Sequence, residues 1–291
     1  IANAGATVLL TNSSAALGSL LVSNATLSFS NWNTLLSATN LTVEKSGVLT
    51  CSGPFTNFVM SNRVNLVCDT LFVAAGGAID VNNKGFIGAR GVGSGSDPLL
   101  GSGPGVLTNY AGAYTIYGGA GHGGFGVSYA YADNPDNTYG SGTEPMEPGS
   151  GGSCYPSQTY MNGGDGGGAV RIMATNVVVN GTISADSSRY PSTGSGGSGG
   201  SVFITCSTIT GTNGLISANG GNAHLTTSIA QGGGGGGRVA VVYDTEAQAL
   251  LPVPSIRFAA HPGRSSQSAT YYPYLPGDIG TLYFPDAAFF S

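Results

Sequence analysis

The sequence repeats one short element: GAVRI at residues 168–172 returns as GSVFI at 200–204 and as GRVAV at 237–241, with a weaker echo, GTLYF, at 280–284. The full copies begin 32 and 37 residues apart. Apolar residues at every second position give a β-strand one buried face. Repetition at this spacing indicates an architecture whose units are each too small to bury a core alone. We therefore predict an all-β, parallel β-solenoid (β-helix) with long glycine-rich loops.

Further strand-like pieces in the chain fit the same prediction. NGTISA at 180–185 returns as NGLISA at 213–218, and LFV at 71–73 is followed by GAIDV at 77–81. The alternative fold is a β-sandwich or jelly roll, whose strands normally lack such self-similarity and whose turns are shorter. The repeats favour the solenoid.

The distribution of strands and glycine divides one predicted solenoid domain, residues 1–291, into four parts. We expect strand-dense coils at 1–84, a Gly/Tyr-rich excursion at 85–167, Gly-rich coils at 168–244, and a Pro-rich C-terminal cap with the last strand at 245–291. The glycine-rich excursions are expected to stack as extended polyproline II-like segments, because only glycine permits so close an approach of backbones.

The composition excludes several classes of protein. Charged residues make up 8% of the chain and the net charge is -5, with only nine Lys and Arg, so there is no basic stripe to bind nucleic acid. No stretch approaches the roughly 18 consecutive apolar residues of a transmembrane helix. The sequence begins at Ile1 without an initiator Met, which favours a secreted, extracellular chain from which a signal peptide has been removed.

The cysteine count suggests two disulfides. Cys51, Cys68, Cys154 and Cys206 show no C-x-x-C spacing that would indicate zinc, and an even number suits an oxidising compartment. We favour pairing Cys51 with Cys68, which are 17 residues apart, the length of one coil. Cys154 with Cys206 then follows by elimination. The connectivity stays open, because sequence alone does not determine it.

No cluster of residues indicates catalysis, a cofactor or a metal. The fourteen acidic residues are dispersed, so the paired carboxylates of a glycosidase are not evident, although different coils could assemble them. His122 lies between glycines that would expose its ring, but it has no partner at ligand spacing. We predict a protein that is not an enzyme. A polysaccharide-degrading β-helix enzyme is the less favoured alternative.

The glycine-rich stretches also carry a resemblance. GGAIDVNNKGF at 76–86, GGAGHGGFG at 118–126, GGSGGSV at 196–202 and the run at 232–241 resemble glycine-rich, β-helix-like repeat regions of large secreted bacterial and protist surface proteins. The resemblance covers residues 18–285. It implies an extracellular, non-catalytic architecture and no particular set of functional residues.

Both ends of the chain read as unprotected strands, free of Lys. The apolar residues concerned are Val8, Leu9 and Leu10 near the start, and Leu282, Tyr283, Phe284, Phe289 and Phe290 near the finish. An unpaired edge strand tends to pair with another chain, so we predict an extracellular filament subunit that joins its own copies head to tail. The alternative is a monomeric carbohydrate-binding or adhesive module that contacts extracellular polysaccharide through Tyr129, Tyr131, Tyr139 and Tyr155.

Overall fold

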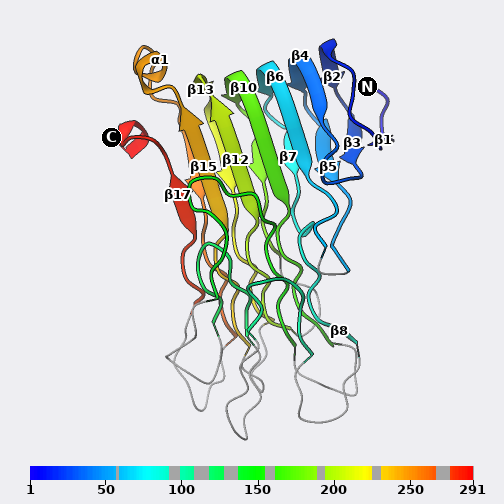
Figure 1. Ribbon diagram of the computed structural model, residues 1–291, viewed down its shortest axis with the longest axis vertical. Helices are drawn as coiled ribbons and strands as arrows, with labels where there is room; N and C mark the ends of the chain where they lie inside the picture. Colours follow the sequence, from blue (N-terminus) through cyan, green and yellow to red (C-terminus); the bar gives the residue numbers. More distant parts are fainter. Residues whose placement is uncertain are drawn as a thin grey trace, which may run out of the picture.

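The computed structural model describes residues 1–56, 59–91, 99–107, 118–127, 137–154, 161–188, 194–224, 231–266 and 276–290. Most strands belong to two large parallel sheets that stand above a set of extended glycine-rich segments (Figure 1). The α-helix α1 (Thr245–Ala249) and the 3-10 helix η1 (Ala288–Phe290) lie at the end where the chain finishes. A short antiparallel pair joins β8 (Arg90–Gly91) to β9 (Met161–Asn162).

The seven-stranded sheet is parallel, and its register is regular apart from one irregularity between Thr212 and Gly214, where β14 pairs with β16. Its order is β1 (Ala6–Leu10), β3 (Ala25–Phe29), β5 (Val48–Cys51), β7 (Ala78–Asp80), β11 (Thr182–Ser184), β14 (Thr212–Ser217) and β16 (Ser255–Ala259). One apolar residue from each strand forms a continuous inward column: Val8, Leu27, Leu49, Ile79, Ile183, Ile216 and Phe258. The five inner strands therefore bury the same position against the same core, while Val8 and Phe258 stand at the two ends of the column.

The eight-stranded sheet contains the repeated element. It runs β17 (Thr281–Tyr283), β15 (Arg238–Tyr243), β12 (Ser201–Cys206), β10 (Ala169–Val179), β6 (Val64–Val73), β4 (Leu36–Val43) and β2 (Leu17–Val22), with β13 (Thr208–Thr210) on the second half of β10. Val170 lies opposite Val202, Val202 opposite Val239, and Val239 opposite Leu282. The alignment of the sequence repeats is thus the register of neighbouring strands.

The predicted β-solenoid over residues 1–291 is wrong. The strands form two large parallel sheets, of seven and eight strands, and strand accounts for only 39% of the structure. The prediction failed because it treated the glycine-rich stretches as loops of β-coils, whereas these stretches form a hydrogen-bonded layer of their own. The sandwich alternative is also wrong, because every strand pair within the two large sheets is parallel.

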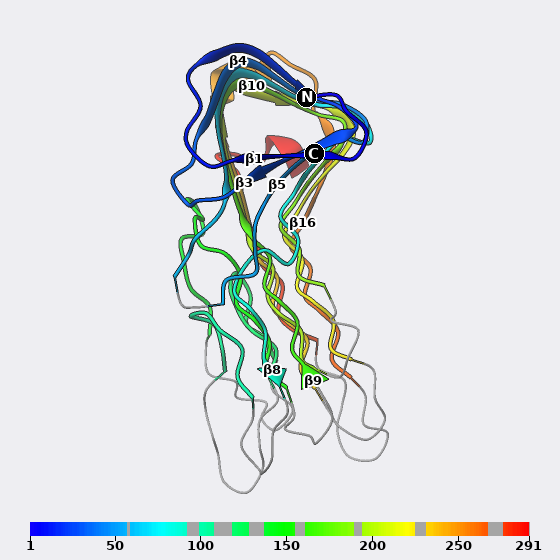
Figure 2. The same cartoon turned by 90° about the vertical axis from the view of Figure 1, so that its right-hand side faces the viewer.

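The two sheets enclose one apolar core. Figure 2 looks along the direction in which the strands stack, and the strands of each sheet lie one behind another around that core. Its largest fully buried apolar side chains are Phe29, Leu41, Leu49, Leu66, Leu71, Ile79, Ile172, Ile183, Ile204, Ile209 and Ile216. Burial of each such side chain contributes about 1.5–3 kcal/mol relative to leaving it in water. The core therefore stabilises the sheets and not the layer beneath them.

The glycine-rich segments are held together by backbone hydrogen bonds. Within residues 194–200, the donors to a given neighbouring segment recur every three residues. The bonds run from Ser195 N–H to Ser153 O and from Ser198 N–H to Ser150 O on one side, and from Gly196 N–H to Gly232 O and from Gly199 N–H to Gly235 O on the other. Three residues per turn is the period of polyproline II, which has no internal hydrogen bonds and so leaves its backbone groups free for neighbours.

These segments approach one another too closely for side chains. A Cβ atom on Gly196 would lie 1.8 Å from the carbonyl oxygen of Gly221, and one on Gly200 would lie 1.9 Å from that of Gly168. Both distances are far below the 3.0 Å under which real Cβ atoms essentially never approach backbone. Glycine is therefore required here by the spacing between segments and not by a turn.

A ladder of Asx side chains joins successive segments where the strands of the seven-stranded sheet end. Asn82 Oδ1 accepts a hydrogen bond from the Asp186 N–H at 2.6 Å, and Asp186 Oδ1 accepts one from the Asn219 N–H at 2.6 Å. Asn219 Oδ1 in turn accepts from the His261 N–H at 2.8 Å. Burial raises the pKa of the Asp186 carboxyl group, while the bonds from Asn219 and Ser217 oppose that rise. The ladder keeps neighbouring segments in register below the sheet.

The four cysteines are buried thiols, and neither predicted disulfide is formed. Cys51 ends β5 in the seven-stranded sheet, whereas Cys68 lies on β6 in the eight-stranded sheet. Their separation of 17 residues therefore takes the chain from one sheet to the other, so the two cysteines do not lie side by side on neighbouring strands. Cys154 and Cys206 likewise form no disulfide. Burial raises the pKa of Cys51 and of Cys206 to about 12, which keeps both thiols protonated.

We expect Gly196→Ala to destabilise the fold by about 1–3 kcal/mol, or to prevent folding, because the new methyl group overlaps the backbone of Gly221. Urea unfolding followed by circular dichroism measures this change. The control is Gly18→Ala on β2, where a Cβ atom meets nothing within 4 Å, and its effect should stay below about 1 kcal/mol. Equal effects of the two substitutions would contradict the close-approach argument.

Candidate functional site at the exposed ends of the sheets

The first strand of the chain is an open sheet edge. β1 pairs with β3 on one side, and the described part of the chain places no strand on its other side. Val8 and Leu9 are 40% and 55% exposed, and Leu10 is half-buried against the core. Val8 belongs to the inward column but remains exposed because nothing covers it. These three predicted interface residues therefore lie on one open edge.

The opposite edge of the same sheet is β16, which the sequence analysis missed. The segment SIRFA at 255–259 lies inside the stretch assigned to a Pro-rich cap, although its alternation of buried Ile256 with exposed Arg257 is typical of a strand. When the register is followed strand by strand from β1, Thr7 is in line with Arg257 and Val8 with Phe258. The two edges of the sheet are therefore complementary in length, direction and register.

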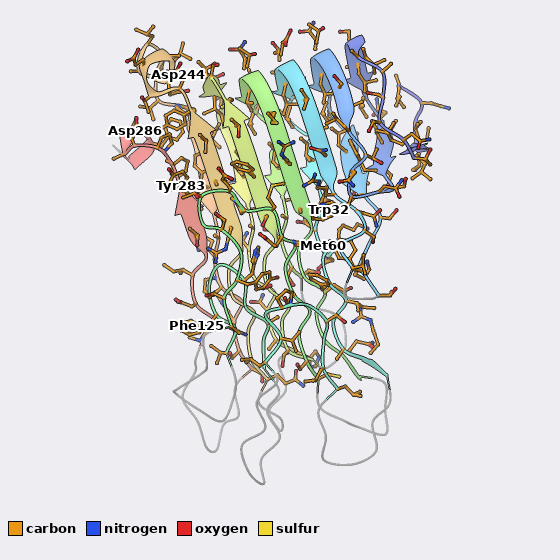
Figure 3. All side chains as sticks on the ribbon, viewed as in Figure 1. Trp32, Met60, Phe125, Asp244, Tyr283 and Asp286 are labelled. Carbon is orange, nitrogen blue, oxygen red and sulfur yellow. The ribbon has the colours of Figure 1, made fainter. Side chains whose placement is uncertain are left out.

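An aromatic lid covers the core beside β16. We define it as Tyr243, Phe258, Phe284 and Phe289. The ring centroid of Phe289 lies 4.8 Å from that of Tyr243, 5.4 Å from that of Phe284 and 6.0 Å from that of Phe258. The Tyr243 hydroxyl also donates to the Asp286 carboxylate, and Figure 3 labels Asp286 at this end. The C-terminal residues thus pack over the end of the core.

The lid changes the role of the predicted C-terminal interface residues. Phe284 and Phe289 are half-buried within it, and Tyr283 is half-buried on β17. Leu282 remains 38% exposed. The side chain of Phe290 lies outside the described residues. These residues therefore mainly cover the end of the core, and little of their apolar surface is left exposed for another copy.

Helix α1 closes the edge of β13 in the eight-stranded sheet. Gln248 Oε1 accepts from the Ile209 N–H at 2.8 Å, and Gln248 Nε2 donates to Ile209 O at 3.1 Å, so the side-chain amide takes the place of a neighbouring strand's backbone. The side chain of Asp244 caps the helix by accepting from two backbone N–H groups. β2 is the edge strand at the other end of this sheet, and the register places it in line with β13. Because Gln248 already occupies the edge of β13, a β2 strand from another copy could not pair there.

The segments that lead from the eight-stranded sheet to the seven-stranded sheet stack in a row. An exposed apolar segment, which we call the apolar corner, lies at one end of this row, and a hollow lies at the other end. Leu250 is 85% exposed, and Leu251 and Val253 beside it are also exposed. They connect α1 to β16. A hollow of about 260 Å³ at the other end is lined by Ala4, Gly5, Asn24, Ala25, Thr26 and Ser46. Asn24 and Ser46 belong to the equivalent connections that enter β3 and β5.

A buried polar cluster lies among the glycine-rich segments. The fully buried His122 bonds Gly199 O through Nδ1 at 2.9 Å, and its ring stacks on Tyr139 at 4.5 Å. Arg238 reaches from β15 to the carbonyls of Tyr139 and His122 at 2.9 and 3.2 Å. Burial, aided by the charge of Arg238, lowers the pKa of His122 to about 4. The cluster therefore joins three segments and holds the imidazole neutral.

Of the four tyrosines predicted to contact a glycan, the structure describes Tyr139, which is half-buried. Burial raises the pKa of Tyr139, and its hydroxyl donates to Pro148 O at 2.6 Å and accepts from Ser150 Oγ at 2.9 Å. Tyr129, Tyr131 and Tyr155 lie outside the described residues. Among the residues that are described, no three His, Cys, Asp or Glu side chains gather as metal ligands, and no helix has the length and apolarity to cross a membrane.

We expect stability to fall as the pH decreases from 6.5 towards 4. In this range the unfolded chain binds a proton on His122 that the folded chain excludes, which costs about 1.4 kcal/mol per pH unit. Urea unfolding at a series of pH values measures the slope. His122→Gln should reduce it, whereas His261→Gln, at an exposed position, should leave it unchanged. A slope that is the same in all three proteins would refute the role of His122.

Comparisons with family models, with curated proteins and with solved structures find no match to this chain. The resemblance to glycine-rich surface proteins therefore stays a prediction from the sequence. The geometry of the described residues singles out the matching edges β1 and β16 as the candidate site.

Proposed function

We propose that this is an extracellular structural protein, not an enzyme, whose copies assemble head to tail into a filament. The proposed contact is β-augmentation, in which β1 of one copy adds to β16 of the next and continues the seven-stranded sheet. One observation carries the proposal: Val8 and Phe258 stand at the two ends of the same inward column, on two open edges. The extracellular location rests on the sequence.

The parallel order of the sheet supports this contact. A copy displaced along the stacking direction presents β1 parallel to β16, at the ordinary strand spacing of about 4.8 Å. The contact is heterologous, so it leaves one edge open at each end of the pair and permits further addition. The two edges carry no like charges, because β1 has no charged residue and β16 has only Arg257.

The corner and the hollow support the same displacement. Because both lie in one row of connections, addition of a copy brings the exposed Leu250 and Val253 of one subunit towards the hollow beside Gly5 and Asn24 of the next. Apolar area covered in this way adds about 25 cal/mol per Å² to the association. The hydrogen bonds of the edges then set direction and register, while the corner adds buried apolar surface.

We expect Val8→Lys to abolish filaments while the subunit still folds. Val8 is exposed in the subunit but would face inward at the junction, where a buried ammonium group is strongly disfavoured. Leu9→Lys is the matched control, because Leu9 shares its outward column with Ser28 and Thr50 and would remain in water. Negative-stain electron microscopy and sedimentation velocity measure assembly. Wild-type protein that stays monomeric at high concentration would contradict the proposed assembly.

The register of the junction gives a second test. The double variant Thr7→Cys with Arg257→Cys should form disulfides between copies on mild oxidation, because facing residues of paired strands have Cα atoms within the roughly 4.4–6.8 Å of a disulfide. The control, Thr7→Cys with Ser255→Cys, is two residues out of register and should cross-link much less. Non-reducing gel electrophoresis reads the result. Equal cross-linking of both variants would show that the pairing differs from the one proposed.

A further inference from the structure

Two arginines lie on the outer side of the eight-stranded sheet, Arg171 on β10 and Arg63 directly before β6. Arg171 on β10 is opposite Asn65 on β6, and its Nη1 donates to Asn65 Oδ1 at 3.3 Å. Arg63 stands two residues before Asn65, and alternate residues of an extended chain share a face. The two guanidinium groups therefore flank Asn65, which they leave only 5% exposed.

An aromatic side chain holds one of these arginines in place. The Arg63 Cζ atom lies 4.7 Å from the centroid of the Trp32 ring, and Arg63 Nε donates to Trp32 O at 2.8 Å. Arg63 is only 9% exposed, so its guanidinium is fixed rather than free in water. Figure 3 places Trp32 where the strands give way to the glycine-rich segments. Close by in sequence, Asn62 Oδ1 is buried and has no hydrogen-bond partner.

The positive charge of this cluster is not balanced within the described part of the chain. No Asp or Glu forms an ion pair there with Arg63 or Arg171; the salt bridge in the described residues joins Arg90 to Asp165. Burial lowers the pKa of Arg63, and the charge of Arg171 lowers it further. In a chain with nine Lys and Arg and a net charge of -5, two arginines thus lie close enough to repel each other, with no ion-pair partner among the described residues. An oxyanion between them would remove this repulsion.

We propose that Arg63, Arg171 and Trp32 form a binding site for an anionic polysaccharide, with a carboxylate or sulfate group held between the two guanidinium groups. A planar guanidinium matches an oxyanion with paired N–H donors, and the Trp32 ring offers an apolar surface to the adjacent sugar ring. Two cations are too few to follow a row of phosphates, which disfavours nucleic acid. The site does not depend on filament formation, since it lies on the outer face of the sheet.

The test measures binding of the purified wild-type protein to polygalacturonate, dextran sulfate and neutral dextran by biolayer interferometry. We expect binding to at least one charged polymer, weaker binding at high salt, and none to neutral dextran. The two charged polymers distinguish a carboxylate from a sulfate ligand. Single-stranded DNA bound as tightly as either polymer would overturn the proposal, because it would show attraction to any polyanion.

Arg171→Gln is the decisive variant, and Arg264→Gln, at another exposed arginine, is its matched control. Loss of one charge-assisted contact should weaken binding roughly tenfold. The same change should not lower the melting temperature of the free protein, because it relieves repulsion with Arg63; a purely structural arginine would lower it. Unchanged affinity of Arg171→Gln, or an equal loss in Arg264→Gln, would refute the site even if filaments form as proposed.

Discussion

The distance between glycine-rich segments is the constraint on which the rest of the structure depends. Backbones that would leave only 1.8 Å between an added Cβ and a neighbouring carbonyl oxygen exclude every residue larger than glycine at such positions. Because no side chains intervene, successive N–H groups can bond different neighbours, as those of Ser195 and Gly196 do and those of Ser198 and Gly199 do again. The layer is therefore held by hydrogen bonds in three dimensions, and it needs almost no apolar side chains of its own.

Such a layer cannot define its own register, because identical glycines can slide past one another at little cost. The two sheets supply the missing information. The segments that end at β10, β12 and β15 lead into strands whose register is fixed by Val170, Val202 and Val239, and the Asx ladder from Asn82 to His261 extends the register of the seven-stranded sheet beyond its strands. His122, Tyr139 and Arg238 then link three segments beside the starts of β12 and β15.

The sequence allowed prediction of the strands that carry the repeat, because GAVRI and GSVFI alternate buried and exposed residues at a constant offset from glycine. It also allowed the prediction that glycine-rich segments stack as extended chains, but not which segments lie side by side, since Ser195 finds Ser153 only after both segments are in place. Two parts of the candidate site were missed for the same reason. β16 is a strand because β14 lies beside it, and Gln248 caps β13 only through tertiary contact. The position of Val8 and Leu9 on an open edge, by contrast, followed from local pattern alone.

The two open edges are not equivalent, and this gives any assembly a direction. β1 is bare, whereas β16 lies beside the aromatic lid, in which the Phe289 ring is stacked on Phe258 with an interplanar angle of 8°. The Phe289 ring thus covers the Phe258 end of the inward column. A copy that adds its β1 at this edge must pack Val8 beside Phe289, within the layer that the lid occupies. The C-terminal residues are therefore both the cap of the isolated subunit and part of the core of the proposed junction, so the packing of the lid controls addition at one end only.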